Sequence, residues 1–480
     1  MDRDNKTMPP NIILITTDQQ RWDFYDNRTV RSLRTPNLQR LMREGATLTN
    51  ATSNCPICIP TRFTWCHGLY ASQGAARLLR NCHDWPHDLP GMPQALQGAG
   101  YQTAIIGKLH AHEGLWHRDL CDTEYVQSTR DRGFDHVFEV CGKSLAFWFD
   151  CNWTRHLERR GLLDDYRRDL AVRSGQISGE DARGDYGPGI LSTEESMDGF
   201  IGRNVCEWLG ERRPGAPFFL HASFCGPHGP LDPPEEFAER YDPAEMPPPE
   251  GVDDAEEIRR WKRLRALYCA QVELIDVQIG RLLQTLEDQG LLEDTAIVFG
   301  TDHGDMLGHL GKSGKGPAYD TSCRTPYVVW WPGRVPAGQT LTGPVEAVDL
   351  PATIMDIAGL GSDPAAHIPY SPGRSFLPYA AGESGPPREW AYAEWGGGED
   401  AWRMCREPDW KYVVSPSGDQ LFNLAEDPWE TVNRVDDPAL RERISRMRRR
   451  VIESMLQTVT PDTIPQRPRD DWWLKGEDNA

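Results

Sequence analysis

The sequence predicts an α/β fold: a large, mostly parallel (mixed) sheet sandwiched by helices, followed by a smaller C-terminal α+β subdomain with a short antiparallel sheet. Uninterrupted apolar and β-branched runs such as NIILITT, residues 11–17, are typical of strands that are covered on both faces. Segments with helical periodicity alternate with these runs, which is the order found in parallel sheets. A chain of 480 residues is also long enough for one large and one small unit.

The individual elements follow from the same patterns. Buried strands are predicted at residues 11–17, 101–106, 217–224, 295–301 and 327–331. Helices are predicted after Thr35-Pro36, before Gly98, and over residues 255–288, where Gly290 follows as a stop signal. In the long helix, apolar residues from Val272 to Leu286 recur on one face, which indicates a helix packed against the sheet.

The segment GESGPPR, residues 382–388, is rich in turn formers and predicts a boundary between residues 1–385 and residues 386–480. Short alternating segments at 390–394, 410–414 and 420–424 predict a small antiparallel sheet. A final helix is predicted to pack through Ile444, Met447, Val451 and Met455. Its arginines are interpreted as a solvated face and not as a nucleic-acid site.

Composition and charge exclude several classes of partner. The net charge of −20 repels a phosphate backbone, so no nucleic acid is expected. The chain has no run of about 20 apolar residues, so no membrane span is expected. Its start lacks the layout of a signal peptide, and its 12 cysteines are scattered, which favours a cytoplasmic protein with free thiols, or a periplasmic one if a signal has been trimmed. A homo-oligomer is compatible with the sequence, which does not specify it.

Polar residues follow four of the predicted strands. They are Asp18 and Gln19, Lys108 and His110, His228, and Asp302 and His303. Ligands of open α/β sheets bind beyond the carboxyl ends of the strands. Four separate segments are therefore predicted to deliver metal-type or anion-type side chains to one edge of the sheet.

The stretch NCPICIPTRFTWCHG, residues 54–68, contains the order Cys58-x-Pro60-x-Arg62. This C-x-P-x-R order resembles the signature of the sulfatases, the formylglycine-dependent enzymes of the alkaline phosphatase superfamily. Further matches occur in family order at Asp18-Gln19, Gly107-Lys108-Leu109-His110, Pro227-His228-Gly229-Pro230 and Thr301-Asp302-His303-Gly304 with Lys315. The tail around residues 421–428 also resembles the family's C-terminal subdomain, so the resemblance covers most of the chain.

The resemblance implies hydrolysis of small-molecule sulfate monoesters to an alcohol and inorganic sulfate. Cys58 is implied as the precursor of a formylglycine that a formylglycine-generating enzyme produces; one hydroxyl of its hydrate attacks sulfur and the second allows sulfate to be expelled. One divalent cation, Ca²⁺, Mn²⁺ or Mg²⁺, is expected, because carboxylate and amide oxygens are hard ligands and His303 favours Mn²⁺. The implied ligands are Asp18, Gln19, residue 58, Asp302 and His303.

The remaining matched residues receive roles from the resemblance. Arg62 and Lys108 are expected to orient the hydrate, and His110 to act as the base for sulfate elimination. His228 and Lys315 are expected to hold the substrate oxygens, and one of them to protonate the leaving group.

The chain departs from the family pattern at two places. Sulfatases commonly carry two aspartates where this chain has Asp18-Gln19, a pair that looks more like the phosphonate monoester hydrolases and some promiscuous arylsulfatases. Hydrolysis of phosphonate monoesters or phosphodiesters at the same site is therefore the alternative function, although Lys108 and His110 follow the sulfatase pattern. After the arginine, the usual L-T-G is replaced by Cys66-His67-Gly68.

A second alternative belongs to another class, a non-catalytic or redox protein on this fold. Cys55 and Cys58 form a C-x-x-C pair, but Pro60 and Arg62 have no role in a redox pair, and no second cysteine pair completes a zinc site. His309 is interpreted as a surface histidine, although its closeness to Asp302 in the sequence leaves a role in substrate binding open.

Overall fold

The computed structural model describes residues 8–74, 84–86, 89–112, 119–173 and 187–458. Its centre is an eight-stranded sheet in the order β5-β4-β6-β1-β7-β8-β2-β9. The strands are β1 (Asn11–Asp18), β2 (Ala46–Leu48), β4 (Gln102–Gly107), β5 (His136–Glu139), β6 (Phe218–Pro227), β7 (Thr295–Thr301), β8 (Tyr327–Trp330) and β9 (Gln339–Leu341). The strands from β5 to β7 are parallel, whereas β8 pairs antiparallel with both β7 and β2. The predicted mixed, mostly parallel sheet is confirmed.

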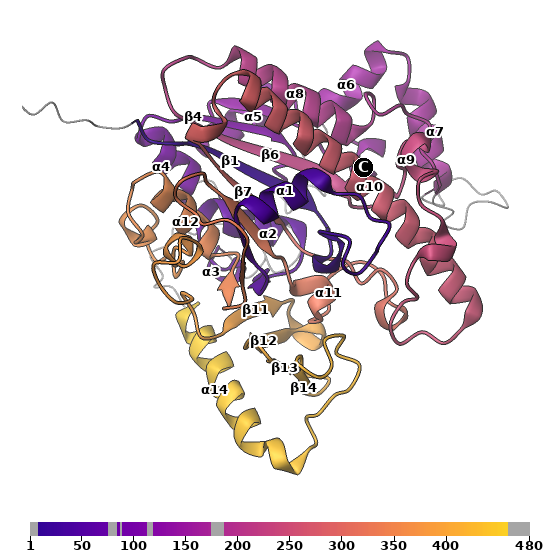
Figure 1. The fold of residues 1–480 in the computed structure, drawn as a ribbon, viewed down its shortest axis with the longest axis vertical. Helices are drawn as coiled ribbons and strands as arrows, with labels where there is room; N and C mark the ends of the chain where they lie inside the picture. The colour runs from indigo at the N-terminus through magenta and orange to yellow at the C-terminus, as the bar shows by residue number, and fades with distance from the viewer. Residues whose placement is uncertain (1–7, 75–83, 87–88, 113–118, 174–186, 459–480) are drawn as a thin grey trace, which may run out of the picture.

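Helices cover both faces of this sheet (Figure 1). Ile12 and Leu14 of β1 pack into one hydrophobic cluster with α2 (Cys58–His67), α4 (Met92–Gly98) and α12 (Asp349–Ile357). Ile13 and Ile15 point the other way and pack with α1 (Pro36–Glu44), α8 (Met197–Glu211) and α10 (Ala255–Asp288). Both sets of side chains are buried, which is why the first strand is an unbroken apolar run.

Other helices and strands precede the C-terminal part. They are β3 (Ala51–Thr52), β10 (Val345–Glu346), α3 (Ala71–Gly74), α5 (Thr123–Asp131), α6 (Asn152–Arg159), α7 (Leu163–Arg173), α9 (Glu235–Ala238), α11 (Asp320–Cys323) and α13 (Leu377–Ala380). Within the described ranges, none of the helices combines the length and the apolar character needed to cross a membrane.

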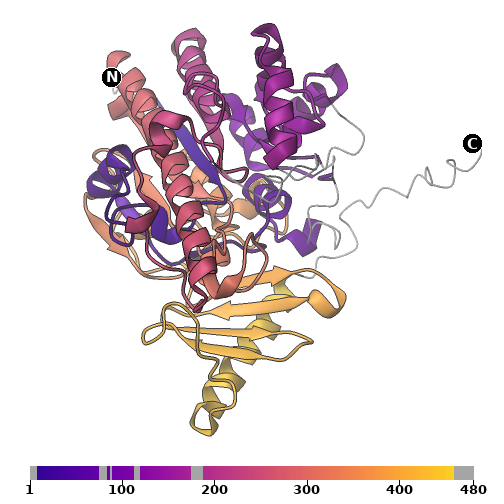
Figure 2. The same cartoon turned by 90° about the vertical axis from the view of Figure 1, so that its right-hand side faces the viewer.

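The C-terminal part is a four-stranded antiparallel sheet with one long helix. Its elements are β11 (Ala391–Trp395), β12 (Trp402–Arg406), β13 (Trp410–Val414), β14 (Gln420–Asn423) and α14 (Arg441–Gln457). Figure 2 shows this sheet and α14 below the rest of the molecule. The small sheet is confirmed, but β12 is not among the predicted strands. In α14, Met447 and Val451 are buried, whereas Met455 is 42% exposed and does not belong to the packed face.

A buried group of charges joins this small sheet to α11. Arg406 donates to both oxygens of Asp320, at 3.1 and 2.8 Å, and Lys411 lies 2.5 Å from the same carboxylate. Lys411 also lies 2.6 Å from Glu430. Because each buried charge has an opposite partner, the desolvation cost of the group is offset. The group fixes the segment that follows Lys315 against the C-terminal sheet.

His67 is the last residue of α2, and it is buried. Its Nδ1 lies 3.0 Å from the carbonyl oxygen of Pro90, and the rings of Phe63 and Trp85 lie 4.8 and 5.6 Å away between centroids. Gly68, at φ 58°, ends the helix in the left-handed conformation. Burial lowers the pKa of His67 to about 4, although the bond to Pro90 favours the protonated form.

We expect acid to destabilise the protein through His67. Because its pKa is about 4 when folded, below the unfolded value of about 6.5, the unfolded chain binds more protons between these values. The contribution of the neutral imidazole is therefore present above pH 6.5 and lost as the pH falls toward 4, by on the order of 3 kcal/mol. Urea midpoints measured from pH 7 to pH 4 should fall less steeply for His67→Leu than for the wild type. Equal pH slopes would contradict the assignment.

Candidate active site

The polar residues that follow the strands lie together at the carboxyl ends of four neighbouring strands. Asp18 ends β1, Lys108 follows β4, His228 follows β6 and Asp302 follows β7. The four strands are neighbours and parallel, so their carboxyl ends meet at one edge. Cys58, the first residue of α2, lies at the same place because the helix begins beside these strand ends.

Four potential metal ligands converge there. The donor atoms of Asp18, Cys58, Asp302 and His303 all lie within 4.8 Å of one another, and all four residues are buried. Cys58 Sγ lies 3.3 Å from His303 Nε2 and 3.8 Å from Asp18 Oδ1. His303 Nδ1 lies 2.9 Å from the carbonyl oxygen of Gly304, an arrangement that leaves Nε2 to face the cluster. Two carboxylates and an imidazole nitrogen are a donor set that fits one divalent cation.

Two buried cations hold the carboxylates in place. Lys108 Nζ donates to Asp18 Oδ2 at 2.6 Å, and Arg62 Nε donates to Asp302 Oδ2 at 2.9 Å. Arg62 also reaches Asp18 Oδ2 at 3.4 Å. The Oδ1 atoms of the two carboxylates instead face His303 Nε2, at 3.8 and 3.5 Å. Each carboxylate thus binds a cationic side chain through one oxygen and faces the cluster with the other.

Position 58 is a site for negative charge. Lys315 Nζ donates to Cys58 Sγ at 3.2 Å and to Gln19 Oε1 at 2.7 Å. Burial by itself raises the pKa of the Cys58 thiol, but Lys108, Lys315 and His303 together hold it well below its usual value. The N-terminus of α2 acts in the same direction, because its backbone N–H groups favour an anion. An oxygen nucleophile at this position would receive the same stabilisation.

His110 is held next to position 58 in a left-handed backbone conformation, at φ 61°. Its side chain shares a hydrogen bond with Cys58. Burial and the charge of Lys108 lower the pKa of His110 to about 4. The imidazole is therefore neutral at pH 7 and able to accept a proton from a group at position 58.

His228 lies at the border of the cluster and is partly exposed. Its Nδ1 is 2.7 Å from the carbonyl oxygen of Gly229. Burial and Cys58 raise the pKa of Asp18, but Lys108, His228 and Arg62 together hold it below its usual range. His228 therefore contributes to the field at the cluster from the side that solvent reaches.

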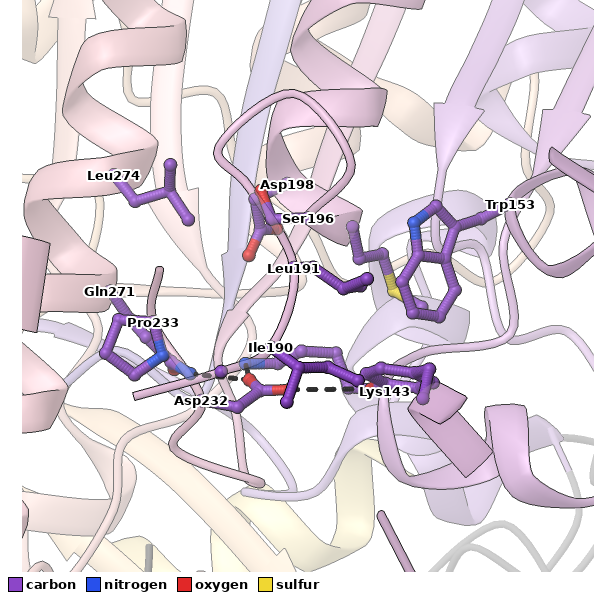
Figure 3. A pocket seen from close by; sticks show the side chains of 13 residues that line it. Lys143, Trp153, Ile190, Leu191, Ser196, Asp198, Asp232, Pro233, Gln271 and Leu274 are labelled. Atoms are coloured by element: carbon purple, nitrogen blue, oxygen red, sulfur yellow. Dashed lines mark hydrogen bonds and ion pairs between the residues drawn. The ribbon is translucent and has the colours of Figure 1, made fainter. Parts of the chain in front are cut away.

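The loop that carries His228 is braced from outside the cluster. Lys143 and Gln271 both donate to the carbonyl oxygen of Pro230, at 2.8 and 2.9 Å. Both also donate to Asp232 Oδ1, at 2.9 and 3.1 Å (Figure 3). The carboxylate and the carbonyl thus share two donors, which fixes the backbone that follows His228.

The structure brings the predicted residues together. Direct contacts connect Asp18, Gln19, Cys58, Arg62, Lys108, His110, Asp302, His303 and Lys315, and His228 borders them. Two residues were not predicted. Ser223, inside β6, accepts from Arg62 at 2.9 Å and donates to the Lys108 carbonyl at 2.7 Å, and no local pattern marks a serine inside a strand. Asp305 contacts Gln19, and its place two residues after His303 was the available signal.

Two further expectations concern residues beside the cluster. The pKa of the Cys55 thiol is raised well above its usual value by burial and by Glu394, the opposite of what a C-x-x-C redox thiolate needs. The prediction that His309 lies on the surface is wrong, because it is fully buried against the rings of Tyr319 and Trp429. Besides these two rings, the carboxylate of Glu250 lies 3.6 Å from its Nδ1.

Lys143→Met is expected to destabilise the protein by about 3 kcal/mol, because it removes the cation from a buried ion pair. The side chains of Lys143 and Asp232 are only 7% and 8% exposed. The double variant Lys143→Met/Asp232→Leu should recover part of the loss, since no carboxylate is then left unpaired. Urea midpoints of the three proteins measure the effect. A single variant as stable as the wild type would show that Gln271 alone satisfies the carboxylate.

Two family models and several known proteins match this chain. The Sulfatase family model matches residues 10–360, and that of the N-sulphoglucosamine sulphohydrolase C-terminal region matches residues 308–457. The chain is 27% identical to an arylsulfatase of Clostridium perfringens over 477 residues, which covers 93% of this chain and 95% of that protein. It is 27% identical to a choline-sulfatase of Rhizobium meliloti over 469 residues, 90% of this chain and 83% of the relative. A solved phosphonate monoester hydrolase of Agrobacterium radiobacter shares the fold, with a TM-score of 0.77, 23% identity, and coverage of 96% and 100%.

Proposed function

Because the chain belongs to the sulfatase family, we propose that it hydrolyses sulfate monoesters of small molecules at position 58, to an alcohol and inorganic sulfate. The observation that carries this proposal is the convergence of cationic side chains and carboxylates on Cys58 at the start of α2. A sulfate ester needs a nucleophile, cations for its anionic oxygens and a proton for the leaving alcohol. The described residues offer each of these within one cluster.

The nucleophile of the proposed reaction is a formylglycine hydrate made from Cys58 by a formylglycine-generating enzyme, and it supplies one hydroxyl for attack and a second for release of sulfate. Support comes from the charges at position 58, where Lys108 and Lys315 already favour an anion. Arg62 and Lys108 keep the neighbouring carboxylates fixed, so that the hydrate is oriented against them. His110, neutral at pH 7, is placed to take a proton from this position.

A divalent cation fits the donor set of Asp18, Asp302 and His303, with residue 58 as a further donor. The side-chain amide oxygen of Gln19, which accepts from Lys315, is proposed as one more. When bound, it supplies positive charge that lowers the pKa of a hydroxyl at position 58 and polarises the ester. The imidazole nitrogen of His303 favours Mn²⁺ over Ca²⁺ and Mg²⁺.

The substrate oxygens are assigned to the more exposed edge of the cluster. Lys315 and His228 are both partly exposed, unlike the buried carboxylates. Lys315 carries a charge that can hold an anionic oxygen, and His228 can donate a proton to the departing alcohol.

A second candidate function is hydrolysis of phosphonate monoesters or phosphodiesters at the same site. Gln19 favours it, because the Asp18-Gln19 pair resembles that of the phosphonate monoester hydrolases, and a solved enzyme of that kind shares the fold. The Lys108 and His110 pair favours sulfate.

Substitution of the proposed nucleophile or ligand tests the mechanism. Cys58→Ala and Asp302→Ala are each expected to lower kcat by more than about 10³-fold, the first by removing the nucleophile and the second by losing the cation. Excess Mn²⁺ or Ca²⁺ should restore little activity to Asp302→Ala. Cys55→Ala is the matched control and should stay near wild type. Near-normal turnover by either test variant would refute the mechanism.

Substrate preference is tested with a sulfate ester and a phosphonate ester that share the same leaving group. We expect kcat/KM to be higher for 4-nitrophenyl sulfate than for 4-nitrophenyl phenylphosphonate, measured on protein made beside a formylglycine-generating enzyme. The mass of the peptide that contains residue 58 should be that of the aldehyde. An intact thiol in a fully active preparation would exclude the modification, and the reverse preference would support the second candidate function.

A further inference from the structure

The side-chain amide of Gln19 lies between a carboxylate and an ammonium group. Its Nε2 donates to Asp305 Oδ2, and its Oε1 accepts from Lys315 Nζ at 2.7 Å. A carboxylate only accepts hydrogen bonds, and an ammonium group only donates them. The two neighbours therefore fix the orientation of the amide independently, with its oxygen on the side of Lys315.

The second oxygen of Asp305 holds the loop that leads to Lys315. Oδ1 accepts from the backbone N–H of Leu307 at 2.8 Å and from that of Gly314 at 3.0 Å. Gly314 directly precedes Lys315 in the sequence. Asp305 is only 9% exposed, so water is a poor substitute for these bonds.

We propose that Asp305 is a positioning residue of the active site, which orients the Gln19 amide and fixes Lys315 beside position 58. The contact of Lys315 Nζ with Cys58 Sγ, at 3.2 Å, depends on both the loop and the amide. The inference rests on the proposed function, because the oriented amide oxygen and ammonium group are the ones that would meet a cation and an anionic substrate. Asp305 acts on them only through Gln19 and the loop.

The same contact explains why residue 19 is an amide. A glutamate in this place would set two carboxylates within hydrogen-bonding distance of each other in a buried site, where like charges repel strongly. Only a side chain with both a donor and an acceptor satisfies Asp305 and Lys315 together. The contact with Asp305 therefore accounts for an amide at position 19, where sulfatases commonly carry an acidic residue.

A polarity swap tests the contact. Asp305→Asn and Gln19→Glu each set two donors or two acceptors face to face, whereas the double variant restores a donor on one side and acceptors on the other. The readouts are the Mn²⁺ dissociation constant, measured by calorimetry on metal-free protein, and KM and kcat for 4-nitrophenyl sulfate. If the two substitutions acted independently, the fold-changes that they cause in the Mn²⁺ dissociation constant would multiply. We expect the double variant to bind Mn²⁺ at least about tenfold more tightly than this product gives, and to recover KM more than kcat.

A dissociation constant of the double variant that lies within about threefold of the product of the two single fold-changes would overturn the proposal. If Asp305→Asn is insoluble, recovery of soluble protein by adding Gln19→Glu supports the contact, and failure to recover it counts against it. The matched control is Asp363→Asn, an exposed aspartate that likewise accepts from a backbone N–H, that of Ala365 at 3.0 Å, and it should change neither readout.

The experiment separates this inference from the proposed function. Calorimetry with Mn²⁺ needs no substrate, so coupled binding by a protein that hydrolyses neither ester would uphold the role of Asp305 while the function fails. Additive binding in an enzyme that is active on 4-nitrophenyl sulfate would overturn only the role of Asp305.

Discussion

The buried ion pair between Arg62 and Asp302 is the interaction on which the site depends. The guanidinium group also reaches Asp18 and Ser223, so one side chain on α2 connects the interior of β6 with the ends of β1 and β7. Isolated charges are costly to bury, and the carboxylates and the guanidinium can therefore be buried only together. Cys58 precedes Arg62 by four residues, which places both on one face of the helix. The spacing of the C-x-P-x-R order thus has a geometric cause: the residue that binds the carboxylates also brings position 58 to them.

Much of the fold and most of the candidate site could be predicted because both depend on local patterns. The unbroken apolar run of β1 predicts a strand covered on two faces, and the polar residues Asp18 and Gln19 directly after it predict a strand-end site. Parallel pairing then brings Asp302 of β7 to the same edge, although it lies far away in the sequence. The site follows once the topology is known, because strand ends in such a sheet are neighbours by construction.

The features that the sequence does not reveal depend on contacts between distant segments. In β12 the alternation of apolar and polar residues breaks at Cys405 and Arg406, and Arg406 is buried only because Asp320 pairs with it. His309 looks like a surface residue until Tyr319 and Trp429 are placed around it. Short edge strands such as β5 carry too few buried residues to give a signal. At β12 and at His309, tertiary partners override the local preference.

The C-terminal sheet also reaches the active site, through the segment after Lys315. Trp402 Nε1 donates to the carbonyl oxygen of Gly316 at 2.9 Å, and Lys411 donates to that of Ala318 at 3.1 Å. Gly316 has φ 109°, and a Cβ there would lie 2.8 Å from the ring of Trp395, so only glycine allows this packing. Lys315 is therefore held from the large sheet before it and from the small sheet after it. Both parts of the chain thus fix the Lys315 side chain, a cation that must meet an anion at a defined place. The small sheet therefore contributes to the geometry of the site although none of the proposed ligands lies on it.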